Sequence, residues 1–206
     1  MRHIWLTWAA FFLAAASIAG IAPPSRAEGA VPPVSAQDRL LGKEDAPVTI
    51  IEYGSLTCPH CAEFDRETLP EIKKNWIDTG KVRLVFRLFP LNQLDLHAAM
   101  LAHCVPPERY FAFIDTVYKS QVKWMQASDP QQALSNIARL AGVGEDKIKS
   151  CLADKSIEDE VVATAYAAQQ SGVESTPTFF INGQKPEKNG AQPYDVFDQL
   201  LTAAQH

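Results

Sequence analysis

The sequence has 206 residues, of which 47% are hydrophobic and 21% are charged, and its formal net charge is −5. This composition is that of an ordinary globular protein with one domain, or one domain with an insertion, and neither the charge nor any basic run favours nucleic-acid binding. The four cysteines are an even number, which permits two disulfides.

The first segment has the features of an export signal. An apolar run over residues 4–21 is ended by Pro23-Pro24, and Ser25-Arg26-Ala27 supplies the small residues typical of cleavage before Glu28. We expect residues 1–27 to be a signal peptide, with an uncleaved membrane anchor as the alternative. In either case the domain is exported, and disulfides persist in an oxidising compartment.

The next segment, residues 28–41, is predicted to be a linker with a short helix at its end. Val48–Tyr53 is expected to be the first strand. Its apolar residues occupy both odd and even positions, which indicates a central strand buried on both faces. A helix is expected over Cys61–Asp78 with a kink at Pro70. Lys81–Phe89 alternates as a second strand, so the three elements form a right-handed, parallel βαβ unit.

The middle of the chain is almost wholly helical in pattern. Strand character returns at Thr178–Ile181, and Asn182-Gly183 is a strong hairpin signal, so a return strand is expected within Lys185–Gln192. A final helix is expected over Tyr194–Ala204. The helices expected in the middle of the chain are Asp95–Cys104, Glu108–Tyr118, Gln131–Ala141, Lys147–Ala153 and Ile157–Gln170.

The motif Cys58-Pro59-His60-Cys61 lies between the first strand and the following helix, where a Cys-x-x-Cys indicates a redox site. Pro59 suits the first helical position, which places Cys58 at the N-cap beside unpaired amides that favour a thiolate. Cys61, one turn further on, can attack a mixed disulfide on Cys58. The alternatives are an inert disulfide or a zinc site, but zinc needs four ligands and there is only one Cys-x-x-Cys.

His60 lies between the two cysteines. By spacing alone its ring can reach the Cys58 sulfur, so we expect the imidazole to donate to the thiolate or to lie charged beside it. The alternative is an exposed histidine on the first turn of a helix.

The chain from about Gly42 onward resembles the DsbA family of exported thiol–disulfide oxidoreductases. The resemblance rests on CPHC after VTIIEYGSLT, on the helical block, and on STPTFFING from Ser175 to Gly183. It implies an α/β, thioredoxin-like fold with a central mixed sheet and an inserted all-helical subdomain. Residues 42–92 and 171–206 would form the thioredoxin-like domain, and residues 93–170 the helical insertion.

The resemblance also implies roles for single residues. Most X–Pro bonds are trans, but the family places a cis-proline loop, here Thr176-Pro177, against the two sulfurs, where the Thr176 backbone can pair with substrate. Glu52 resembles a buried acid near the inner cysteine. Burial would raise its pKa and allow it to move a proton to or from Cys61, whereas the alternative is a strand-end carboxylate in water.

The other two cysteines, Cys104 and Cys151, lie in the helical block. We expect them to form a structural disulfide, as in a subset of the family, and the alternatives are a second redox pair or free thiols.

The function expected from these observations is donation of the Cys58–Cys61 disulfide to folding exported proteins in the periplasm. The resemblance implies reoxidation by a membrane protein of the DsbB type, with no bound cofactor or metal. Only Glu28–Pro47 precede the first strand, too few residues for a dimerisation domain, so we expect a monomer. A disulfide isomerase or reductase of the same fold and a non-catalytic peptide-binding chaperone remain as alternatives.

Overall fold

The computed structural model describes residues 30–205. The expected signal peptide, residues 1–27, therefore lies outside the described residues. Within residues 30–205, no helix has both the length and the apolar character needed to cross a membrane.

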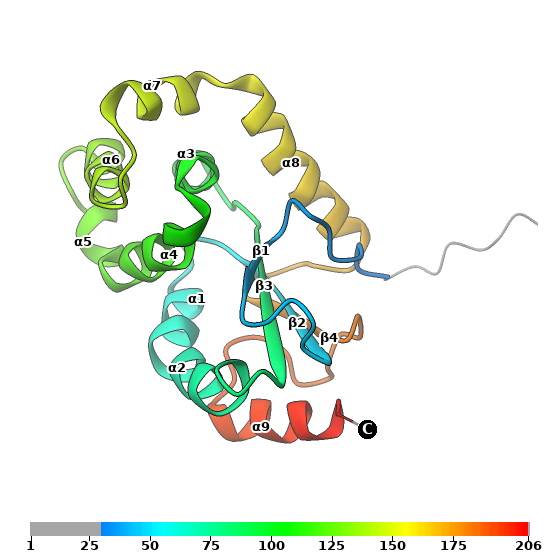
Figure 1. The fold of residues 1–206 in the computed structure, drawn as a ribbon. Coiled ribbons are helices and arrows are strands. Elements are labelled where there is room, and N and C mark those ends of the chain that lie inside the picture. Colours follow the sequence, from blue (N-terminus) through cyan, green and yellow to red (C-terminus); the bar gives the residue numbers. More distant parts are fainter. Residues whose placement is uncertain (1–29, 206) are drawn as a thin grey trace, which may run out of the picture.

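Four strands form a mixed sheet in the order β1-β3-β2-β4 (Figure 1). β2 and β3 are parallel, as the βαβ pattern predicts, and β1 and β4 lie antiparallel on either side of them. Both central strands are buried along almost their whole length, because helices cover both faces of the sheet. The strands are β1 (Arg39–Leu41), β2 (Val48–Gly54), β3 (Val82–Leu88) and β4 (Thr178–Ile181).

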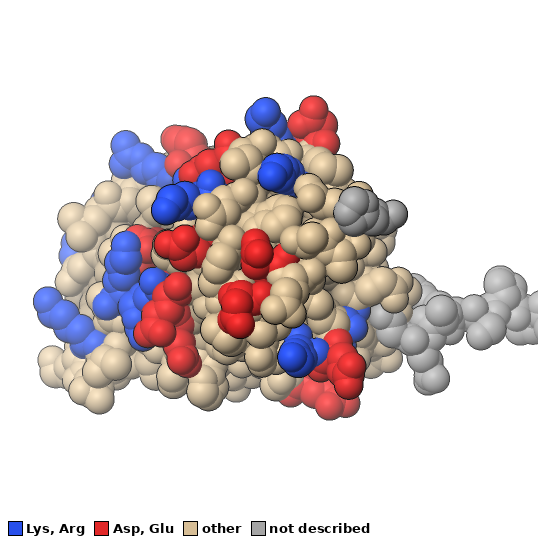
Figure 2. Space-filling view, turned by 90° about the horizontal axis from the view of Figure 1, so that it is seen from below, with Lys and Arg blue, Asp and Glu red and all other residues tan. Residues whose placement is uncertain are grey.

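The helical insertion forms a separate layer beside the sheet, and α2 packs against α9 on one face of the sheet (Figure 1). The face that carries α9 has acidic and basic side chains next to one another (Figure 2). Every helix expected from Cys61 onward is present within a few residues, and the short η3 and α5 are additional. The helices are α1 (Pro59–Glu63), η1 (Phe64–Thr68), α2 (Leu69–Ile72), η2 (Lys73–Ile77), α3 (Gln93–Cys104), η3 (Pro107–Arg109), α4 (Tyr110–Lys119), α5 (Gln121–Met125), α6 (Pro130–Leu140), α7 (Glu145–Ala153), α8 (Lys155–Gln170) and α9 (Tyr194–Ala203).

The helix that follows the cysteine motif begins at Pro59 and contains two π-helical turns, η1 and η2. The first of them directly precedes α2, and in it the Leu69 N–H donates to the Phe64 carbonyl. Pro70 has no N–H to donate to the carbonyl of Arg66, so the regular hydrogen-bond pattern cannot continue through this turn. A kink was expected at Pro70, and the structure has a widened, π-helical turn just before it.

The expected linker is partly wrong, because its last residues form strand β1 rather than a short helix. The segment before it is held by Arg87 of β3, which makes an ion pair with Asp38 at 2.8 Å and donates to the carbonyls of Pro32 and Pro33. Both charged side chains are about nine-tenths buried. A buried, fully paired guanidinium therefore fixes this segment against the sheet.

The return strand expected within 185–192 is not formed. Asn182 and Gly183 have the positive φ angles of a tight hairpin turn, at 48° and 80°, but the chain pairs again only at the bridge between Ile181 and Gln184. Beyond it, the side-chain amide of Asn189 accepts from the Phe179 N–H and donates to the Phe179 carbonyl, both at 2.8 Å. One side chain thus takes the place of a paired strand residue at this edge of the sheet.

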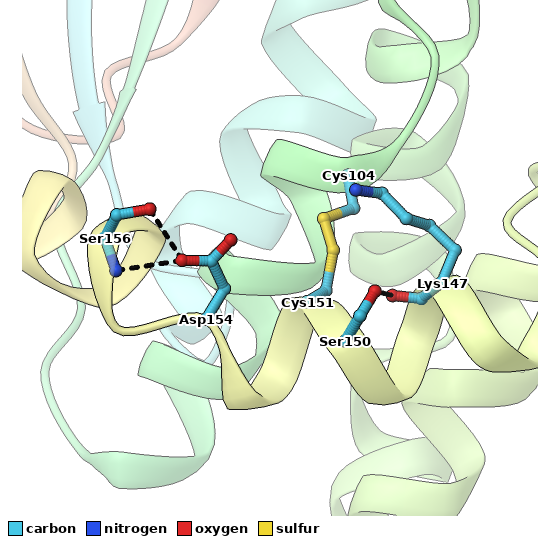
Figure 3. Close-up of a disulfide and its surroundings, with 6 residues drawn as sticks. All are labelled: Cys104, Lys147, Ser150, Cys151, Asp154 and Ser156. Atoms are coloured by element: carbon cyan, nitrogen blue, oxygen red, sulfur yellow. Dashed lines mark hydrogen bonds between the residues drawn. A yellow bond between two sulfur atoms is a disulfide. The ribbon is translucent and has the colours of Figure 1, made fainter.

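Cys104 and Cys151 form the expected disulfide, which joins the end of α3 to α7 (Figure 3). Their Cα atoms are 6.4 Å apart, within the range that a disulfide spans. Shortly after Cys151, the carboxylate of Asp154 accepts from the N–H and hydroxyl of Ser156 and caps α8. The disulfide therefore crosslinks two helices of the insertion, α3 and α7.

Candidate active site

The turn after β2 delivers Cys58 to the start of α1. Cys58 has extended backbone angles, φ −81° and ψ 122°, and occupies the N-cap position with Pro59 in the first turn, as the sequence predicts. Cys58 is 7% exposed, and Cys61, one turn on, is fully buried. The two sulfurs are therefore unequal: only Cys58 offers an accessible surface to a partner.

The surroundings of Cys58 lower its pKa to about 5. The largest cause is a hydrogen bond from the Cys61 thiol; the side chain of Thr176 and the backbone amides of Cys61 and His60 add to it, while burial acts in the opposite direction. These donors lie at a helix N-terminus, where free N–H groups stabilise a negative charge. At pH 7 a pKa of about 5 leaves about 1% of Cys58 protonated.

The environment of Cys61 raises the pKa of its thiol, whereas that of Cys58 lowers it. Burial raises its pKa far above the ordinary value, and the hydrogen bond to Cys58 and the charges of Glu52 and Cys58 raise it further. Cys61 thus stays protonated in the dithiol state and donates a hydrogen bond to Cys58. As the outer sulfur loses its proton easily and the inner one keeps it, the reduced form is a thiolate–thiol pair.

Glu52 lies on β2 with 2% of its surface exposed, so the alternative of a strand-end carboxylate in water is wrong. Burial raises its pKa well above the ordinary value, and the nearby charges of Asp65 and Cys58 raise it further. A carboxyl group with a raised pKa can hold a proton near neutral pH.

Asp65 is a second acid near the site, half-buried, that sequence reasoning missed. Burial and repulsion from Asp115 raise its pKa to about 7, and its Oδ2 atom has no hydrogen-bond partner in the part of the chain that the structure describes. Asp65 lies in η1, which packs against α4, close to the charges of Asp115 and Lys119. The sequence showed only its place in a helical pattern, which does not distinguish a partly buried acid from a solvated one.

The Thr176–Pro177 peptide bond is cis, as the resemblance implies. The Cys58 thiol donates to the Thr176 carbonyl oxygen at 3.3 Å, across a sequence separation of 118 residues. The loop therefore lies directly beside the accessible sulfur. The buried hydroxyl of Thr176 makes no fully formed hydrogen bond among the described residues, but it lies near enough to Cys58 to help lower the pKa of that thiol.

The His60 ring does not lie against Cys58 as expected. Its Nδ1 atom is 3.2 Å from Glu63 Oε2, and 73% of the side chain is exposed. What His60 contributes to the low pKa of Cys58 in this geometry is its backbone N–H. The position of His60 in the motif allows its ring to reach the sulfur, but Glu63, three positions along the helix, is the partner that the ring contacts.

Three buried side chains of the insertion, Asp95, Tyr118 and Gln121, hold the turn that precedes Cys58. Asp95 accepts from the Ser55 hydroxyl at 2.6 Å and from the Leu56 N–H at 2.8 Å. Tyr118 donates to the Ser55 carbonyl at 3.2 Å. Sequence analysis missed all three, because polar residues in a helical pattern give no sign of a partner in another part of the chain.

These features define the class of protein. A stabilised thiolate at a helix N-terminus, a buried thiol one turn away and a cis-proline carbonyl beside them form a thiol–disulfide exchange site. Its place after the first central strand of a mixed sheet is that of the thioredoxin-like fold. Within the described residues, no group of three or more His, Cys, Asp or Glu side chains is arranged to hold a metal ion.

Comparison with known proteins identifies the family. The model of the family described as thioredoxin matches residues 35–203. The "Probable disulfide bond formation protein D" of Bacillus anthracis is 32% identical over 169 residues, 79% of this chain and 75% of the relative. The crystal structure of alpha-DsbA1 from Wolbachia pipientis has a TM-score of 0.75 and 36% identity, and the match covers 85% of this chain and 93% of that one. The chain therefore belongs to the DsbA branch of the thioredoxin family.

A third relative differs in length. The "Putative protein-disulfide oxidoreductase" of Rickettsia bellii is 35% identical over 156 residues, which are 75% of this chain but only 60% of the relative. The match thus spans about three-fifths of that protein.

Proposed function

We propose that the protein is an exported thiol–disulfide oxidoreductase that donates its Cys58–Cys61 disulfide to folding proteins. The observation that carries this proposal is the opposite perturbation of the two thiols, with the pKa of Cys58 lowered to about 5 and that of Cys61 raised. A stabilised Cys58 thiolate favours the reduced enzyme, and a couple whose reduced form is favoured gives its disulfide to others. The names of the relatives from Bacillus and Rickettsia support the same chemistry.

The reaction begins when a substrate thiolate attacks the Cys58 sulfur. The Cys58–Cys61 bond breaks, its electron pair remains on Cys61, and Cys61 takes up a proton, for which the protonated carboxyl of Glu52 is the proposed source. A second substrate thiolate then attacks the substrate sulfur of the mixed disulfide, and Cys58 leaves as a thiolate. The substrate has lost two electrons to form its disulfide, and the enzyme has gained them.

We further propose that substrate binds as an extended segment along the Thr176–Pro177 loop. The backbone of Thr176 would pair with the segment that contains the reacting cysteine, a form of strand addition. The 3.3 Å contact between Thr176 and the Cys58 sulfur supports this, since a segment paired there would have its sulfur next to Cys58.

Turnover requires an oxidant for the reduced enzyme. A membrane protein of the DsbB type is the proposed acceptor, with the protein acting as a monomer in the periplasm after removal of residues 1–27. The export signal expected from the sequence supports this location.

The decisive experiment equilibrates the protein with defined ratios of reduced and oxidised glutathione and measures the fraction of Cys58–Cys61 disulfide. We expect a couple more oxidising than glutathione, rapid oxidation of a reduced, unfolded substrate and poor rescue of a scrambled one. A couple more reducing than glutathione, or rescue of scrambled substrate faster than oxidation, would instead assign the protein to the reductases or isomerases of this fold. Activity that survives loss of both cysteines would indicate a chaperone.

A further inference from the structure

A cavity of about 380 Å³ lies between the sheet and the helical insertion. Its walls come from the segment before β1, from β3, from the junction of α3 and α4, and from α8. None of Cys58, Cys61 and Pro177 is among the residues that line it. The volume falls within the range of small-molecule sites, which often lie where two parts of a protein meet.

Arg87 lines this cavity but is not free to bind a ligand. Its guanidinium donates to both carboxylate oxygens of Asp38, to the Tyr53 hydroxyl and to the carbonyls of Pro32 and Pro33. These five hydrogen bonds use all five N–H groups of an arginine. Arg87 and Asp38 are therefore part of the wall, and their charges neutralise one another.

Three other polar side chains at the cavity retain unused hydrogen-bonding capacity. Tyr110 is only 2% exposed as a residue, and its hydroxyl, which is not itself fully buried, makes no hydrogen bond within residues 30–205. The Arg39 guanidinium lies over the Tyr110 ring, 5.5 Å from its centroid, and makes no ion pair with a described residue. His103 completes the group, and burial lowers its pKa, so that its neutral ring can donate one N–H near pH 7.

The remaining walls are mostly apolar. Phe86, Leu88 and Val161 are buried residues that border the cavity. The one free acidic side chain among the described lining residues is Glu160, which is exposed on α8 but near enough to His103 that its charge partly opposes the effect of burial on the pKa of that ring. The cavity thus offers an arginine, a tyrosine hydroxyl and an imidazole on one side, and an apolar surface elsewhere.

We propose that this cavity binds a small organic monoanion, a carboxylate on a compact apolar or aromatic body. The carboxylate accepts from the guanidinium of Arg39, the hydroxyl of Tyr110 and the ring of His103. The apolar body lies against Phe86, Leu88 and Val161. An arginine is well suited to a carboxylate because its planar fork can donate two parallel hydrogen bonds, and the Tyr110 hydroxyl gains an acceptor there.

The test uses 3-phenylpropionate as the probe and the uncharged 3-phenylpropionamide as its matched control. Each is titrated into the purified, isotope-labelled protein while backbone amide shifts are followed by NMR. We expect saturable shifts for 3-phenylpropionate at Arg39, His103, Tyr110 and Val161, and binding of the amide weaker by about tenfold or more, as is typical when a charged hydrogen bond is lost. Equal binding of both probes, or saturable shifts of neither at these residues, would overturn the proposal.

Variants separate the proposed contacts from a general effect on the fold. Arg39→Gln and Tyr110→Phe should each weaken 3-phenylpropionate binding, whereas Arg139→Gln on α6 should leave it unchanged. Glu160→Gln should bind the anion as well or better, because a nearby negative charge is removed, and a loss of binding in this variant would contradict the proposed anion site. Unchanged reactivity of the Cys58 thiol in every variant would establish that the fold is intact and that this site is separate from the redox site.

Discussion

The side-chain amide of Gln121 lies 3.0 Å from the carbonyl oxygen of Cys58 and donates a hydrogen bond to it. The same amide donates to the Leu56 carbonyl, also at 3.0 Å, and Gln121 is only 5% exposed. A side chain of the helical insertion therefore holds the residue that carries the reactive sulfur. The insertion is thus part of the redox site.

Gln121→Ala should destabilise the protein and raise the pKa of Cys58. The buried Leu56 carbonyl loses its side-chain donor, which costs about 1–3 kcal/mol of unfolding free energy if the group stays unsatisfied, whereas the Cys58 carbonyl keeps the hydrogen bond from the Ala62 N–H. The turn that aims the N–H groups at the sulfur also becomes less constrained. Denaturant unfolding measures the first effect, and the ultraviolet absorbance of the thiolate as a function of pH measures the second. Gln131→Ala, on the exposed face of α6, is the control and should change neither quantity.

Exchange of the two active-site cysteines for serine should have different outcomes. Cys58→Ser should abolish turnover, because the buried Cys61 cannot be reached by a substrate. Cys61→Ser should instead accumulate mixed disulfides on Cys58, which no inner thiol can resolve. Non-reducing electrophoresis and mass spectrometry of the trapped species provide the measurement. Adducts on Cys61 in the Cys58→Ser protein would show that the assignment of the two roles is wrong.

The reduction potential should depend on pH with a change of slope near pH 5. Cys58 titrates only in the reduced form, and its thiolate stabilises that form above the pKa of about 5 and not below it. The potential should therefore fall by roughly 59 mV per pH unit below this value and by roughly 30 mV above it. At pH 7, two pH units above the pKa, the thiolate makes the couple more oxidising by about 60 mV than one with an unperturbed thiol. A single slope from pH 4 to 8 would contradict the low pKa.

His60→Ala tests the part that the imidazole has in this behaviour. The variant keeps the backbone N–H that lies near the Cys58 sulfur and removes only the exposed ring. If the imidazole also stabilises the thiolate, as its position in the motif predicts, the pH at which the slope of the reduction potential changes should be higher in this variant. The same pH in both proteins would assign the stabilisation to the helix backbone, Thr176 and Cys61 alone.

Glu52→Gln should shift the pH dependence of the step in which Cys61 attacks. The charge of Glu52 is one cause of the raised pKa of Cys61, so its removal should lower that pKa and bring the step to lower pH. Stopped-flow resolution of a mixed disulfide at several pH values measures this, with Glu108→Gln as a surface control. Folding should not suffer. The pKa of Glu52 in the folded state is raised above the ordinary 4.5, so its ionisation lowers the stability of the folded state as the pH rises. Glutamine does not ionise and removes this loss of stability. An unchanged pH–rate profile would leave Glu52 without a role in proton transfer.

Replacement of both Cys104 and Cys151 by Ala should lower the melting temperature and leave disulfide exchange largely intact. The crosslink closes a loop with a sequence separation of 47, for which chain entropy predicts a stabilisation of about 4 kcal/mol at most. Both cysteines lie in the helical insertion, Cys104 at the end of α3 and Cys151 in α7. Calorimetry and an oxidation assay on the same preparation provide the comparison. An abolished oxidation rate in a folded variant would imply that this disulfide takes part in electron transfer.

The sequence by itself determined the features that depend on neighbours along the chain. Strand β2, the N-cap position of Cys58 and the first-turn proline follow from apolar parity and from the requirements of a helix start. The type and approximate bounds of the helices of the insertion follow from periodicity in the same way. The prediction of a return strand after Gly183 was wrong, because Asn182-Gly183 indicates only that the chain reverses direction. The side-chain amide of Asn189, not a paired strand, forms hydrogen bonds with the backbone of Phe179 at the edge of β4.

Only the tertiary structure decided which groups far apart in the sequence contact one another, both around the sulfurs and elsewhere in the fold. The Thr176 carbonyl is 118 residues from Cys58 along the chain, Gln121 is 63 residues away, and the Asp38 carboxylate that pairs with Arg87 is 49 residues away. No local pattern marks such partners, because a buried polar group can be satisfied by any donor or acceptor that the packing brings to it. The His60 ring lies on Glu63 for a related reason: spacing limits what a side chain can reach, whereas the folded structure determines which of the reachable partners it contacts.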